Sequence, residues 1–152
     1  MLPILIALHL LAAFVWVGGM IFAHLMLRPV LAGMEGPVRL AVFRGVFARF
    51  FPAVWLAILV LLATGYAMVF GFQGGFAGTG WHVHAMQAIG LVMMALFGHL
   101  YFAPWRRFRL ALADGAPDRA AAALKQIRLI VTVNLVLGVI TVVLGSAGRY
   151  WI

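Results

Sequence analysis

Long apolar runs alternate along the chain with short connections that hold nearly all of its charged residues. A helix needs about 20 mostly apolar residues to cross the hydrocarbon core of a bilayer. Four stretches reach that length, with approximate bounds at residues 3–27, 50–72, 81–103 and 127–147. We therefore predict an all-α fold, in which a bundle of four transmembrane helices forms a single domain over residues 1–152.

The composition agrees with a lipid environment. Hydrophobic residues make up 66% of the chain and charged residues only 9%, whereas about a quarter of a soluble domain is charged. The sequence has no cysteine, which excludes disulfides, thiolate chemistry and iron–sulfur ligation. No basic segment precedes the first apolar run and no small-residue cleavage site follows it, so we interpret it as a retained span.

Positive charge is confined to two of the three connections. Of the eleven basic residues, ten flank the first and third connections: Arg28, Arg39, Arg44, Arg49, Arg106, Arg107, Arg109, Arg119, Lys125 and Arg128. Basic loops remain in the cytoplasm, so we predict a multi-pass protein of the bacterial inner membrane with both termini on the non-cytoplasmic side, N-out and C-out. These charges line the membrane edges, where they suit anionic lipid headgroups. We therefore expect no nucleic-acid partner, despite the net charge of +8.

Both basic connections are predicted to contain helix. Pro37 suits the first position of a helix, and the amphipathic stretch 38–51 is expected to lie on the membrane surface until Pro52 bends the chain inward. In the third connection, a turn over residues 114–118 precedes an alanine-rich helix. We expect that helix to continue without a break into the fourth span.

Five histidines are the most informative polar residues. His9 and His24 lie in the first predicted span, and His82, His84 and His99 lie in the third. Ionisable side chains inside a membrane are costly and usually functional. His9 and His24 are 15 residues apart, as are His84 and His99, so each pair extends about 22 Å along a helix and stays within roughly 60° of one face. Because these two spans run in the same direction, His9 can meet His84, and His24 can meet His99.

Two imidazoles that face each other between helices are the axial ligands of a b-type heme. We therefore predict two heme b groups, with the two histidine pairs as iron ligands. Arg28 and Arg106 lie at the cytoplasmic level, where they can meet anionic propionates. His82 and His84 differ by about 200° around a helix, so only one can face His9. His84 keeps the register, and His82 remains a further candidate metal ligand.

Two hemes stacked through the bilayer would form an electron path. This interpretation makes the protein a transmembrane diheme b-type cytochrome that moves electrons across or within the membrane. An oxidoreductase that uses heme b is the enzyme class it favours, although no catalytic residue can be named. Quinone or a redox protein is a candidate partner, and the four short spans leave a homodimer open.

Copper is the alternative metal. Thioether and imidazole groups suit Cu(I), and the chain has eight methionines in addition to its histidines. Methionines of the third and first spans offer a track through the membrane, namely Met86, Met93, Met94, Met20 and Met26. Methionine is also a common filler of apolar cores, so ordinary packing competes with this interpretation.

The stretch from Leu8 to Gly19, LHLLAAFVWVGG, resembles the first helix of the copper-resistance D (CopD) family. Further positions in the second and fourth spans fit the same pattern, namely Pro52, Thr64-Gly65, Ile127-Arg128, Asn134, Gly138 and Gly145. This resemblance implies a membrane protein linked to copper uptake. It makes copper transport one alternative to the cytochrome.

The layout is also similar to that of HemJ-type protoporphyrinogen oxidases, which are four-helix heme proteins. His9, Trp16 and Gly19 match their first-span pattern. Those enzymes have His-x-Lys at the start of the third span, whereas this chain has His82-Val83-His84 and lacks the lysine. The histidine geometry further resembles that of respiratory b-type cytochromes. Oxidation of protoporphyrinogen is therefore the other alternative function.

Overall fold

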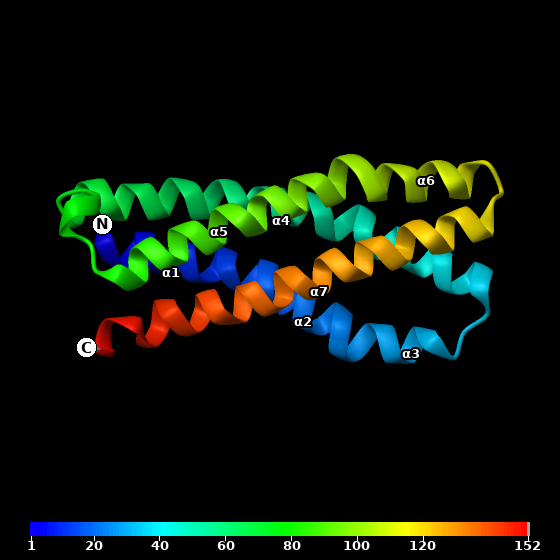
Figure 1. Cartoon of the computed structure of the whole chain (residues 1–152), viewed down its shortest axis with the longest axis horizontal. Coiled ribbons are helices and arrows are strands. Elements are labelled where there is room, and N and C mark those ends of the chain that lie inside the picture. Colours follow the sequence, from blue (N-terminus) through cyan, green and yellow to red (C-terminus); the bar gives the residue numbers. More distant parts are fainter. Residues whose placement is uncertain (152) are drawn as a thin grey trace.

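The computed structural model describes residues 1–151, which fold into four long helical rods lying side by side (Figure 1). Each rod is long and apolar enough to cross a membrane, and their bounds are Leu2–Ala32, Gly36–Phe72, Trp81–Ala113 and Pro117–Tyr150. The prediction of an all-α bundle of four membrane-spanning helices is confirmed. Each predicted span lies inside one of these rods.

π-helical turns interrupt the first and third rods. The first consists of α1 (Leu2–Ala13), η1 (Phe14–Gly18), α2 (Gly19–Ile21), η2 (Phe22–Leu27) and α3 (Arg28–Ala32). The third consists of α5 (Trp81–Leu100), η4 (Tyr101–Trp105) and α6 (Arg106–Ala113). The second rod is the unbroken helix α4 (Gly36–Phe72), which the 3-10 turn η3 (Phe76–Gly78) follows. The fourth is α7 (Pro117–Ala147) with a final 3-10 turn, η5 (Gly148–Tyr150).

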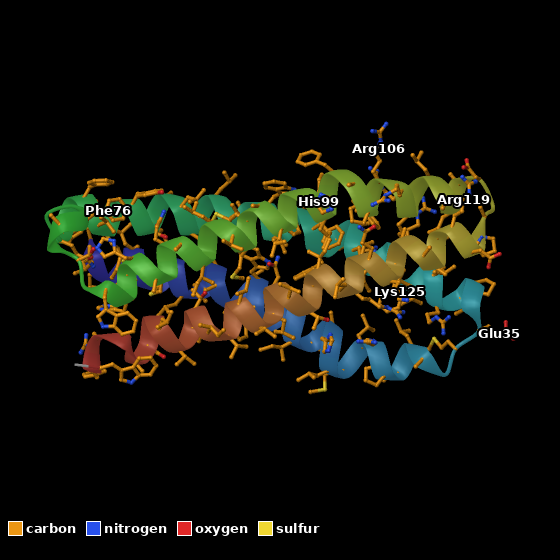
Figure 2. All side chains as sticks on the ribbon, in the orientation of Figure 1. Glu35, Phe76, His99, Arg106, Arg119 and Lys125 are labelled. Atoms are coloured by element: carbon orange, nitrogen blue, oxygen red, sulfur yellow. The ribbon has the colours of Figure 1, made fainter. Side chains whose placement is uncertain are left out.

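Both chain termini lie at the same end of the bundle, together with the connection over residues 73–80 (Figure 1). We call this the terminal end. The connections between α3 and α4 and between α6 and α7 lie at the opposite end, which we call the basic end. Figure 2 shows Arg106, Arg119 and Lys125 toward this end of the bundle.

The rods pack as two pairs that meet in the middle of the bundle. α1 packs chiefly on α4, and α5 packs chiefly on α7. The rings of Trp16 in η1 and Phe97 in α5 join the two pairs edge to face, with their centroids 6.0 Å apart. Toward the basic end, Phe51 of α4 stacks on Phe47 and meets the edge of Trp105 at 5.3 Å. Such close contact stabilises helix association in lipid, where the hydrophobic effect does not act between helices.

The stretch 38–51 is not a separate helix that Pro52 bends away from the second span. It is the first part of α4, which continues through Pro52 without ending. Leu40, Phe43 and Phe47 on this stretch are buried. The surface-helix prediction is therefore wrong, because the apolar face packs on the other rods rather than on lipid. The expected continuous alanine-rich helix is confirmed, since α7 begins at Pro117 and runs through the fourth span.

Candidate functional site

His9 on α1 is held by a threonine of α4. Its Nδ1 lies 2.8 Å from Thr64 Oγ1, and the same hydroxyl lies 2.6 Å from the carbonyl oxygen of Val60. A carbonyl only accepts, so the hydroxyl donates its proton to Val60 and accepts the imidazole N–H. Neutral His9 therefore carries its proton on Nδ1, and Nε2 offers a lone pair.

The same arrangement recurs at two other histidines. Thr132 of α7 donates its hydroxyl proton to a carbonyl of its own helix at 2.9 Å and lies 3.4 Å from His24 Nδ1. Thr79 likewise donates to a carbonyl at 2.8 Å and lies 3.1 Å from His84 Nε2. Each neutral imidazole keeps its second nitrogen as a lone pair. Metal-ligating histidines are oriented in this way, with the other ring nitrogen fixed by a hydrogen bond.

The histidines of the predicted heme pairs have different surroundings. His9 bonds to α4 and His24 bonds to α7, whereas His84 and His99 have exposed side chains on α5 (Figure 2 labels His99). Three of the four have one ring nitrogen within hydrogen-bond distance of a threonine hydroxyl. Heme ligation by the pairs His9–His84 and His24–His99 stays a prediction.

π-helical turns account for the different directions of His9 and His24. A π turn holds one more residue than an α turn, so each one rotates the following residues by about 100° relative to a regular helix. η1 lies entirely between the two histidines, and His24 itself lies within η2. By contrast, α5 is a regular helix from Trp81 to Leu100, so His84 and His99 lie near one face of it, as their spacing of 15 residues predicts.

The predicted propionate partners are also separated. Arg28 lines a cavity of about 30 Å³ beside His24, which has room for little more than one water molecule. Arg106 is exposed on α6 and points away from the bundle (Figure 2). The cavity beside His24 is far too small for a porphyrin.

Soft metal ligands line the contact between α5 and the fourth rod. His82, Met86 and Met93 share one face of α5, because four and seven residues separate them. Each of the three packs on a glycine of the fourth rod: His82 on Gly148, Met86 on Gly145 and Met93 on Gly138. The contacts are close, because a Cβ added to these glycines would lie 2.6 Å from His82 Cβ, 3.2 Å from Met86 Cε and 3.2 Å from Met93 Cε, respectively.

Two residues of the first rod extend this line toward the basic end. Met20 of α2 is buried, with 2% of its surface exposed, and lies one turn beyond Val17, which packs on α7. His24 follows one turn later and bonds to Thr132 of α7. We call the five side chains along α7 the soft-ligand row: His82, Met86, Met93, Met20 and His24. Met26 is not part of it, because its side chain is 56% exposed.

Asn134 of α7 lies beside the middle of the soft-ligand row. It is 1% exposed, and its Nδ2 donates to the carbonyl oxygen of Met93 at 3.2 Å. Its Oδ1 has no hydrogen-bond partner among the described residues. An orphaned acceptor in a hydrocarbon interior costs free energy, so this oxygen is available to a polar or cationic guest.

The candidate ligands are spread along the helices. Within residues 1–151, no three histidine or acidic side chains are grouped so that they could hold a metal ion. Ligands that are spaced singly along a row suit the passage of an ion better than its permanent storage, since conduction requires several weak sites.

Sequence reasoning did not single out Thr79 and Thr132 as histidine partners. Their pairing is set by how the chain packs, and the sequence signal for it is weak. The available hint is that His24 and Thr132 are both polar residues in apolar spans near the basic end.

Comparison with known families matches residues 44–147 to the family described as copper resistance protein D. The matched region includes most of α4, all of α5 and all of α7, and therefore three members of the soft-ligand row. No curated protein and no solved structure matched the chain.

Replacing Thr64 with valine should release His9 from its fixed tautomer. Valine has a similar shape but cannot accept the Nδ1 proton, so we expect the neutral imidazole to populate both tautomers. The measurement is the ¹⁵N NMR shift of labelled His9, assigned with His9→Ala. Thr141→Val is the matched control, because Thr141 also bonds back to its own helix but touches Met93 rather than a histidine. An unchanged His9 signal in Thr64→Val would contradict the proposed hydrogen bond.

Proposed function

Because the chain belongs to the copper resistance protein D family, we propose that it conducts Cu(I) through the bilayer along the soft-ligand row. The observation that carries the proposal is the alignment of His82, Met86 and Met93 on the glycine face of the fourth rod. Imidazole and thioether are the ligand types that Cu(I) prefers. The ion is the cargo of this protein and not a resident cofactor.

The chemistry of the row suits stepwise transfer. A thioether stays uncharged at every pH and binds Cu(I) without taking up or releasing a proton. Transfer of the ion from one methionine to the next therefore requires no proton transfer. Met86 and Met93 are about 10 Å apart along α5, from the helical rise. Met20, the buried methionine of α2, would supply the thioether for the following step toward the basic end. The lone pair on Nε2 of His24 would receive the ion near the basic end.

Orientation follows from the distribution of charge. We propose that the basic end faces the cytoplasm of a bacterial inner membrane, as the positive-inside rule requires. His82 is then the first ligand on the non-cytoplasmic side, and His24 is the last ligand before the cytoplasm. Copper would enter at the terminal end and leave at the basic end.

Single-cysteine labelling checks this orientation, because the chain has no native cysteine. Gln73 and Glu35 are exposed residues at the terminal and basic ends, respectively. A membrane-impermeant maleimide should label Gln73→Cys in intact spheroplasts and should label Glu35→Cys only after permeabilisation. The opposite labelling pattern would contradict the proposed orientation and would mean that copper enters at the basic end, while the proposed ligands would stay the same.

Leucine in place of Met93 should slow Cu(I) uptake into proteoliposomes by about tenfold, which corresponds to about 1.4 kcal/mol on the rate-limiting step. Leucine preserves the volume of the side chain but removes the sulfur, so the helix packing is retained. The readout is the rate at which a trapped Cu(I)-sensitive dye responds. Met26→Leu is the matched control, because it removes an exposed methionine outside the row. Equal rates in a correctly folded Met93→Leu protein would refute conduction along the row.

Transmembrane electron transfer with heme b is the second candidate function, and the free lone pairs on His9 and His24 favour it. Quinone or a redox protein would be the partner, and a homodimer would be one way to complete the sites. The surroundings of His24 do not fit the group, however, since the cavity beside it measures about 30 Å³ and His99 does not line it. A porphyrin would require the rods to separate, so we derive no electron-transfer step.

An absorption spectrum separates these functions. We expect dithionite-reduced protein to lack the b-type bands of a heme at His24, because the space beside this residue is too small for a porphyrin. Two hemes per chain, with one lost in His24→Ala or His99→Ala, would instead establish the cytochrome and overturn the copper proposal. One heme together with porphyrinogen turnover would establish a HemJ-like oxidase.

A further inference from the structure

Arginines from three rods lie near one another toward the basic end, and two of them line the cavity beside His24. Arg28 belongs to α3, Arg39 to α4 and Arg128 to α7. Arg28 and Arg128 line the same small cavity, together with Phe43. Arg39 lies one helical turn before Phe43 on the same face of α4. We call these three residues the arginine cluster. Because its members come from different helices, their proximity is a property of the folded bundle.

Two guanidinium groups of the arginine cluster have donors with no acceptor. Nε of Arg39 and Nε of Arg128 are both buried, and neither has a hydrogen-bond partner among the described residues. The Arg128 guanidinium carbon lies 5.2 Å from the centre of the Phe43 ring, so an aromatic face supports one side of this group. A buried charged donor without a partner is costly, so these atoms indicate a missing acceptor.

The acidic residues of the chain do not supply that acceptor. It has three carboxylates, Glu35, Asp114 and Asp118. Among the described residues 1–151, a single ion pair forms, between Arg119 and Asp114 at 3.0 Å. Glu35 is exposed at the tip of the α3–α4 connection (Figure 2). Three like charges that meet without a counter-charge repel one another, so an external anion would relieve the repulsion.

We propose that the arginine cluster binds a phosphate group. The planar guanidinium fork matches the oxygens of phosphate better than a lysine ammonium does, and all three residues are arginine. A phospholipid headgroup and free inorganic phosphate are the two sources of this chemistry. At the basic end of a membrane-spanning bundle, anionic headgroups lie at the level of the cluster. The inference does not depend on copper conduction, because none of the three arginines belongs to the soft-ligand row.

Thermal unfolding of the purified protein in neutral detergent tests the site. Added phosphatidylglycerol should raise the unfolding temperature by about 5 °C, a shift typical of a ligand that binds the folded state at many times its dissociation constant. Phosphatidylcholine controls for lipid in general, and sodium phosphate is compared with sodium chloride at equal ionic strength. A shift with phosphatidylglycerol alone identifies a headgroup site, and a shift with sodium phosphate identifies a site for the free anion. Equal responses to both lipids, without a phosphate effect, would overturn the proposal.

Charge-neutralising variants locate the site. Arg39→Gln and Arg128→Gln should each abolish the shift, whereas Arg44→Gln should retain it. Arg44 is the matched control because it lies on the same helix as Arg39 but is exposed outside the cluster. Equal losses in all three variants would indicate attraction to overall charge and would contradict a built site.

A measurement on the unaltered chain covers variants that fail to fold. Native mass spectrometry of the wild-type protein, mixed with equal amounts of phosphatidylglycerol and phosphatidylcholine, should show retained adducts of the anionic lipid if the headgroup is the source. With sodium phosphate added instead, retained phosphate adducts would identify the free anion. Adducts in equal proportion from both lipids, with none from phosphate, would again reject the site.

Discussion

The close approach of α7 to the other three rods is the constraint on which this structure depends. α7 contacts elements of every other rod, and at Gly138 and Gly145 its backbone lies directly against side chains of α5. In lipid, helices associate through such contacts at small residues. Flexible thioethers fill the space that these glycines leave open. Helix packing and the candidate copper path are therefore produced by the same set of contacts.

Much of the fold could be predicted from hydropathy, because the length of an apolar run sets where a helix can cross the bilayer. The stretch 38–51 shows where that reasoning ends. Amphipathicity reveals an apolar face, but it does not reveal whether lipid or protein covers that face. In this bundle Phe43 and Phe47 are covered by protein, and α4 extends well beyond the predicted span.

The residue types of the candidate site could be read from the sequence, whereas the threonine partners of its histidines could not. Spacing arguments assume a uniform helix, and the π turns near His24 break that assumption. Met86, Met93 and Met20 were among the five methionines predicted to form a track from their places in the first and third spans, whereas the exposure of Met26 depends on the packing of the first rod. Threonine partners of histidines arise from contacts between distant segments, for which the sequence offers no periodic signal.

The separation of charge between the two ends also bears on what can leave the bundle. A bare monovalent cation that moves from the terminal end to the basic end approaches a growing positive potential, because the arginines there outnumber the carboxylates. A cation that departs in the company of an anion, or is handed to an electronegative acceptor, avoids most of that barrier. In the proposed conduction of Cu(I), the same charge asymmetry from which we infer the orientation would therefore favour a departing species of low net charge.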